Sequence, residues 1–193
     1  MPSSPEPDEA PEAFLRAVTS LREAEHNSNV TLREVPSPGR LAPYSFALSA
    51  EVLAGNDDDL AAGRFVVLHN PDGHDGWEGT TRIVAFVQAD VEEEMGADPL
   101  LPQVGWSWLL DALDSHSAAH HATGGTVTRT SSSRFGALAE QGESCEIELR
   151  CSWTPDDDDL APHLRAFCDV MCSMAGLPPT QPVGVLRLPI TGS

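Results

Sequence analysis

The sequence contains no lysine: its 11 basic residues are all arginines, and they stand against 30 acidic residues. The resulting formal charge of −19 repels the phosphate backbone of nucleic acids and the anionic lipids of a membrane surface. We therefore expect no direct nucleic-acid binding and no membrane partner. The same charge favours attraction to a protein that presents a basic face, although a solvated surface alone would also explain it.

Long apolar runs are also missing. No stretch approaches the ~20 apolar residues of a membrane-spanning helix. Residues 1–8 have neither the basic start nor the apolar stretch of a signal peptide. The four cysteines form no Cys-x-x-Cys pair, so we expect reduced thiols in the core rather than disulfides. These absences together predict a cytoplasmic protein.

Common catalytic signatures are absent as well. The sequence has no glycine-rich phosphate loop, no zinc-protease helix motif and no EF-hand loop. It also has no serine-centred nucleophile elbow. We therefore predict no cofactor and favour a non-enzymatic role, while a family-specific active site stays open.

The composition is that of a folded chain, because hydrophobic residues make up 40% of its 193 residues. Residues 1–10 are rich in Pro, Ser, Glu and Asp and predict a disordered tail, and 190–193 predict a flexible C-terminus. Residues 11–189 are expected to form a single α+β domain.

Helical spacing of apolar residues predicts three helices. The first begins near Pro11, and the second runs over about 107–121 until the Gly124–Gly125 pair ends it. The third follows the acidic segment 156–159 and stops near Gly176.

Alternating apolar and polar residues predict the strands, most clearly at 44–52 and 145–153. Further strands are expected at 30–32, 65–68, 82–90 and 126–135. The 82–90 strand is apolar on both faces, and the Thr- and Ser-rich 126–135 strand is expected at an edge.

Turn-forming residues fill 69–79, which predicts a long loop in a hairpin. The tail after Thr180 is expected to pack extended through Val183, Val185 and Leu188. The order of elements, α-β-β-β-β-α-β-β-α, favours an α+β fold. We predict a mainly antiparallel sheet of about six strands with three helices packed largely on one face.

Tryptophan placement suggests a recognition surface. Trp77 lies in the hairpin loop beside Glu78, and Arg82 follows on the next strand. On the second helix, Trp108 falls on the polar side near Asp111. A large aromatic residue on a polar face favours contact with a partner, although the chain's own 98–102 segment could also bury it. We predict that these five residues form a binding surface.

His116 and His120 offer an alternative site. Their spacing on one predicted helix puts both imidazoles on one face, as a metal site requires, but no third ligand is evident. An ordinary packed or surface helix end explains the pair better. We therefore predict no metal, and a metal-assisted hydrolase stays an alternative function beside a small-molecule-binding protein.

Several segments resemble an uncharacterised protein family. They are Trp77-Glu78-Gly79-Thr80, Asp98-Pro99-Leu100-Leu101-Pro102 and Val104-Gly105-Trp106-Ser107-Trp108-Leu109-Leu110-Asp111-Ala112-Leu113. Through these segments the chain resembles a family of high-GC Gram-positive bacteria, catalogued as domain of unknown function number three thousand. The resemblance implies a small cytoplasmic bacterial protein and carries over no catalytic residues.

The leading hypothesis is therefore a non-enzymatic cytoplasmic binding or regulatory protein whose acidic surface recognises a protein partner. It rests on the missing catalytic signatures, on the charge and on the predicted position of Trp108.

Overall fold

The computed structural model describes residues 10–53 and 59–177. Its elements are α1 (Glu12–Glu23), β1 (Val30–Val35), β2 (Tyr44–Leu53), β3 (Asp59–His74), η2 (Asp75–Trp77), β4 (Gly79–Val91), α2 (Glu93–Ala97), α3 (Leu101–Ser115), β5 (His120–Ser132), η3 (Gly136–Gln141), β6 (Ser144–Pro155) and α4 (Ala161–Met174). Residues 1–9 of the expected tail, and the expected packing of Val183, Val185 and Leu188, lie outside the described residues.

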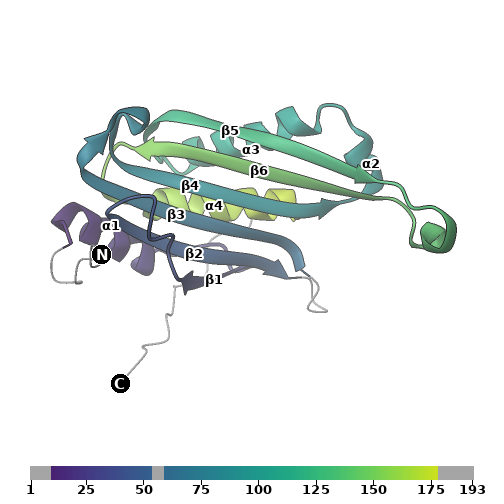
Figure 1. Cartoon of the computed structure of the whole chain (residues 1–193), viewed down its shortest axis with the longest axis horizontal. Helices are drawn as coiled ribbons and strands as arrows, with labels where there is room; N and C mark the ends of the chain where they lie inside the picture. The colour runs from purple at the N-terminus through teal and green to yellow at the C-terminus, as the bar shows by residue number, and fades with distance from the viewer. Residues whose placement is uncertain (1–9, 54–58, 178–193) are drawn as a thin grey trace, which may run out of the picture.

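The strands form one antiparallel sheet in the order β1-β2-β3-β4-β6-β5 (Figure 1). The predicted α+β class, the sheet of six strands and the position of the Thr- and Ser-rich strand β5 at an edge are therefore confirmed. Alternation along β6 shows why the sheet is two-sided, because Ile147, Leu149 and Trp153 are buried while Arg150 between them is exposed.

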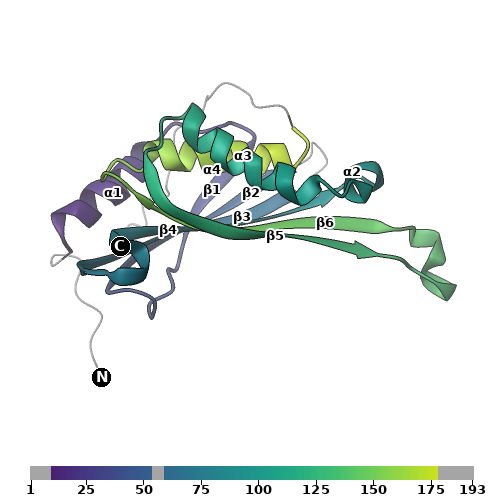
Figure 2. The ribbon, with the colours of Figure 1, turned by 90° about the horizontal axis from the view of Figure 1, so that it is seen from above.

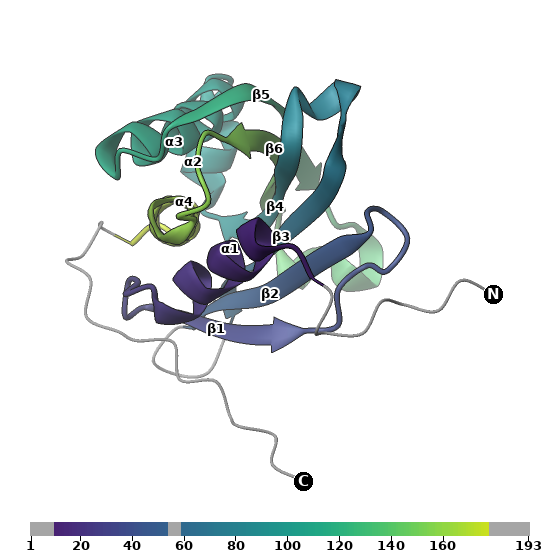
Figure 3. The same cartoon turned by 90° about the vertical axis from the view of Figure 1, so that its left-hand side faces the viewer.

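Helices α1, α4 and α3 lie side by side on one face of the sheet (Figures 2 and 3). The core between the layers includes an aromatic group in which the Phe65 ring centre lies 5.3 Å from that of Phe167 and 6.4 Å from that of Trp153. Arg16 of α1 forms a 2.7 Å ion pair with Asp158, which joins α1 to the loop before α4. The prediction that three helices pack on one face is confirmed.

Helix α4 ends at a glycine, as the sequence predicts. Gly176 adopts a positive φ of 73°, and the Leu177 amide donates to the Cys172 carbonyl at 2.8 Å. The four cysteines are free and buried, in agreement with the predicted reduced thiols. Among the described helices, none is long and apolar enough to cross a membrane.

The second predicted helix has a different end. Helix α3 stops at Ser115, and β5 has already begun at His120, so the predicted end near His121 is wrong. The helix is closed by Ser117, which adopts φ 53° without being a glycine, and the Ala118 amide donates to the Leu113 carbonyl at 2.9 Å. The Gly124–Gly125 pair lies inside β5 instead.

The hairpin between β3 and β4 is confirmed, but its predicted loop is largely strand. β3 continues to His74 after an irregularity in pairing that follows His69, and only the short turn η2 and Glu78 separate it from β4. The Asn70 side chain donates to the Gly73 carbonyl at 2.8 Å and supports this extension.

Strands β5 and β6 extend beyond the rest of the sheet as a two-stranded arm (Figures 1 and 2). Its tip carries η3, and Phe135 beside it is 81% exposed. Arg129, near the root of the arm, donates to the Gly96 and Asp98 carbonyls at 3.1 and 2.9 Å and so holds the end of α2.

The glycine pair of β5 gives a matched test of the sheet edge. A Cβ on Gly125 would stand 2.3 Å from the Arg150 carbonyl oxygen, whereas a Cβ on Gly124 would have no atom within 4 Å. We expect Gly125→Ala to lower the free energy of unfolding by about 1–3 kcal/mol. Gly124→Ala should change it by less than about 0.5 kcal/mol. Urea unfolding measures both, and equal effects would contradict the close approach.

The buried pair Trp153–His163 makes the free energy of unfolding depend on pH. The Trp153 Nε1–H donates to His163 Nδ1 at 3.0 Å, so His163 must be neutral, and burial lowers its pKa to about 4, with His120 contributing. A folded pKa below the unfolded value of 6.5 leaves stability intact above pH 6.5 and removes it as pH falls towards 4. We expect a loss of about 3 kcal/mol across this range from His163 alone.

Urea unfolding of the natural protein and of His163→Gln at several pH values measures this contribution. Glutamine can accept the Trp153 hydrogen bond and cannot become charged, so the variant should lose clearly less stability between pH 7 and pH 5. Parallel losses in the two proteins would show that His163 is not the cause.

Candidate functional site

The candidate site lies on the sheet face opposite the helices. Within residues 10–53 and 59–177, no α-helix covers this face (Figure 2). The face has only a small buried cluster of its own, formed by Ala47, Val66 and Leu68 with Trp77 packed against it. We call this surface the open face.

The pairing register arranges the side chains of the open face in rows across the strands. Over β4, β6 and β5 the rows are Val84, Ser152 and Gly124; Phe86, Arg150 and Thr126; Gln88, Glu148 and Thr128; Asp90, Glu146 and Thr130. Arg64 on β3 and Arg33 on β1 continue the second row. Because residues paired across antiparallel strands share a face, the open face changes from apolar through basic to acidic along the strands.

A hollow of about 510 Å³ lies over the first two of these rows. It exists because Gly124 contributes no side chain there, and Val84 on its floor is 36% exposed. At its rim the Arg150 guanidinium lies 5.3 Å from the centre of the Phe86 ring and donates to Glu148 at 2.5 Å. The mostly apolar lining suits an apolar side chain. We call this feature the apolar hollow.

A second hollow, of about 570 Å³, lies at the other end of β4 and β6. Five carboxylates line it: those of Asp90, Glu92, Glu93, Glu143 and Glu146. The cation in its lining, Arg134, donates to the Gly142 carbonyl at 3.1 Å. In the part of the chain that the structure describes, Asp90, Glu92 and Glu93 have no side-chain hydrogen bond or ion pair. One arginine therefore stands against five carboxylates in this lining. We call this feature the acidic groove.

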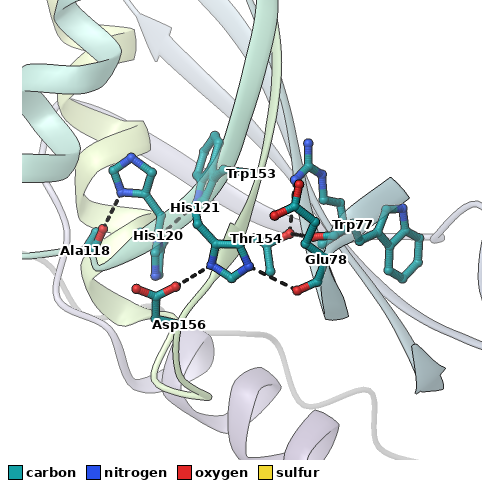
Figure 4. A network of polar contacts seen from close by, with 10 residues as sticks. Trp77, Glu78, Ala118, His120, His121, Trp153, Thr154 and Asp156 are labelled. Carbon is teal, nitrogen blue, oxygen red and sulfur yellow. Dashed lines mark hydrogen bonds and ion pairs between the residues drawn. The ribbon is translucent and has the colours of Figure 1, made fainter. Parts of the chain in front are cut away.

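A polar network closes the end of the open face beyond the apolar hollow (Figure 4). Arg82 is buried there, and it donates to Thr154 Oγ1 at 3.0 Å and to Ser152 Oγ at 2.8 Å. The Thr154 hydroxyl donates in turn to the Trp77 carbonyl, and the Trp77 ring stacks on His74 with 4.9 Å between ring centres. Through these hydrogen bonds Arg82 helps to fix the hairpin turn against β6.

His121 completes this network between three segments (Figure 4). Its Nδ1 lies 2.5 Å from Asp156 Oδ1, and its Nε2 lies 3.1 Å from the Glu78 carbonyl oxygen. Both partners are acceptors, so the ring can donate from both nitrogens when it is protonated. The hydrogen bond to Asp156, followed by that to Glu78, raises the pKa of His121 above its ordinary 6.5.

The five residues predicted as one binding surface divide between two places. Trp77, Glu78 and Arg82 meet at one end of the open face. Trp108 and Asp111 belong to α3 on the helical side, where Trp108 is half-buried against the main core and Asp111 is exposed. The structure does not join the two groups into one surface, and the role of each group in binding stays a prediction.

The alternative pair His116 and His120 does not share a helix face. His116 follows the last residue of α3, with its Nε2 2.6 Å from Asp169 Oδ2 on α4. His120 begins β5, with its Nδ1 2.7 Å from the Ala118 carbonyl oxygen. The helical geometry proposed for a metal is therefore wrong. No group of three or more His, Cys, Asp or Glu residues within the described ranges could hold a metal ion.

The residues of the apolar hollow and the acidic groove were missed by sequence reasoning. Their grouping depends on the register of β4, β6 and β5, which no local pattern reveals. One signal was present: the 82–90 strand is apolar on both faces, although the face that carries Val84 and Phe86 has no helix above it.

The chain belongs to the family described as "Protein of unknown function (DUF3000)", whose model matches residues 10–185. This family agrees with the one that the sequence resembles. Comparison with the curated proteins and with the solved structures finds no match.

The imidazolium of His121 can be tested by titration. Because its folded pKa is raised, its contacts are complete below pH 6.5 and weaken as pH rises through the folded value. We expect the ring resonances to titrate above pH 6.5 in NMR spectra, and Asp156→Asn to lower that midpoint. The control is Asp169→Asn, which removes the carboxylate beside His116 instead and should leave the His121 midpoint unchanged. A midpoint below 6.5 in the natural protein would contradict the doubly donating ring.

Proposed function

We propose that this protein is a non-enzymatic cytoplasmic binding protein of a high-GC Gram-positive bacterium, with a regulatory role, whose acidic surface recognises a protein partner with a basic face. The observation that carries the proposal is the open face, which ends in the acidic groove. A formal charge of −19 adds long-range attraction to a basic partner.

The shape of the open face supports a macromolecular partner. Sites for small ligands are concave and enclose most of the ligand, whereas both hollows on this face are shallow and open to solvent.

A charge-reversed variant tests the proposal. The pull-down uses lysate of the native host at low and at moderate salt, with bound proteins identified by mass spectrometry. We expect the natural protein to capture a basic partner at low salt and to release it at moderate salt. The double variant Asp90→Arg/Glu93→Arg should bind this partner about tenfold or more weakly. Both residues are exposed, so the fold should be retained.

The matched control is Asp111→Arg/Asp114→Arg, which changes the net charge equally on an exposed part of α3. Equal losses in the two variants would point to net charge alone. Loss in the control only would place the interface on the Trp108 side, and no partner at either salt would overturn the proposed function.

A further inference from the structure

The two hollows of the open face lie along the same two strands. Val84, in the apolar hollow, and Asp90, in the acidic groove, are both on β4. Strands rise ~3.3 Å per residue, so these positions are about 20 Å apart. Between them lies the row of Phe86 and Arg150, which Arg64 continues on β3.

On this basis, and resting on the proposed function, we propose that the docking element of the partner is an amphipathic basic helix lying along β4 and β6. One apolar side chain of the helix fills the apolar hollow, and basic side chains at its other end enter the acidic groove. A helix rises ~1.5 Å per residue, so about 13 residues span the two hollows.

Helices are the natural cover for a sheet face, since they bury an apolar stripe against it. The inner face of this sheet is already covered in this way by α3 and α4, of 15 and 14 residues. A partner helix of similar length therefore reaches from the apolar hollow to the acidic groove. The apolar floor at Val84 supplies the anchoring contact that charge alone does not provide.

The basic row fixes the direction of the helix. Arg33 and Arg150 share the row of Arg64 but pair with Glu51 and Glu148. Arg64 is exposed and makes no ion pair within the described residues. Cationic side chains are repelled from Arg64 and attracted to the acidic groove, so the reverse orientation is disfavoured. A second copy of the chain fits poorly, because each copy carries a formal charge of −19.

Site-specific photocrosslinking tests the proposal. The photoreactive residue p-benzoylphenylalanine replaces Thr126 at the apolar hollow, Thr130 at the acidic groove or, as a control, Ser115 on the helical side; all three positions are exposed. The full-length protein is irradiated in lysate of the native host, and crosslinked peptides are sequenced. We expect Thr126 and Thr130 to mark one helix of one partner, at apolar and basic positions about nine residues apart.

Three results would overturn the inference: crosslinks from Ser115 only, two unrelated partner segments, or a second copy of this chain. Each of these leaves the proposed function standing if the natural protein still binds a basic partner in the pull-down. Absence of any partner in that pull-down would instead remove the proposed function, so the two failures are distinguishable.

Filling the apolar hollow gives a quantitative test. Gly124→Val places a side chain where no atom lies within 4 Å, so we expect folding to be retained and the captured partner to bind about tenfold more weakly. Ser115→Val, at an exposed position on the helical side, should leave binding unchanged. If Gly124→Val does not fold, Val84→Gln on the floor replaces it. Undiminished binding by a folded variant would refute the anchor.

Discussion

Alternation of apolar and polar side chains along the strands determines how this molecule is built. On β6, residues such as Ile147 and Trp153 face the helices, while Glu148 and Arg150 between them face the other way. Helices α1, α3 and α4 lie on the side of the first set, because covering the apolar face of a sheet stabilises the fold. The opposite set then has no helix among the described residues to cover it. The core and the open face are thus two consequences of one pattern.

The two faces are held differently. The inner face contains large packed side chains and buried polar contacts such as that between Trp153 and His163. The open face is closed at one end by Arg82, Thr154 and His121, whose hydrogen bonds fix the hairpin turn. At its other end the acidic groove has five carboxylates and one arginine in its lining. Rigid support beside unpaired charge is what a recognition surface requires, because little ordering then remains to be done on binding.

The fold could be predicted because its signals are local: alternation identified the strands, and Gly176 marked the end of α4. The end of α3 could not, since Ser117 adopts a left-handed conformation that sequence reasoning reserves for glycine. Because the helix was predicted to continue to about residue 121, His120 was assigned to it and paired with His116 as a metal site. The rows of the open face could not be predicted for another reason. They depend on the pairing register of strands that are distant in the sequence. Hence Trp77 and Arg82 lie together as their closeness in sequence suggests, whereas Trp108 lies apart from them, against the main core.

The two-stranded arm places a chain connection far from the contacts that hold the sheet together. Its tip, from Phe135 through η3, is exposed and lies beyond the paired residues of β5 and β6. A peptide bond cut there would separate the chain into two pieces, yet β5 and β6 would stay paired along their full lengths, and β6 would stay paired to β4. The molecule is therefore suited to reconstitution from two fragments, with the sheet rather than the backbone keeping them together.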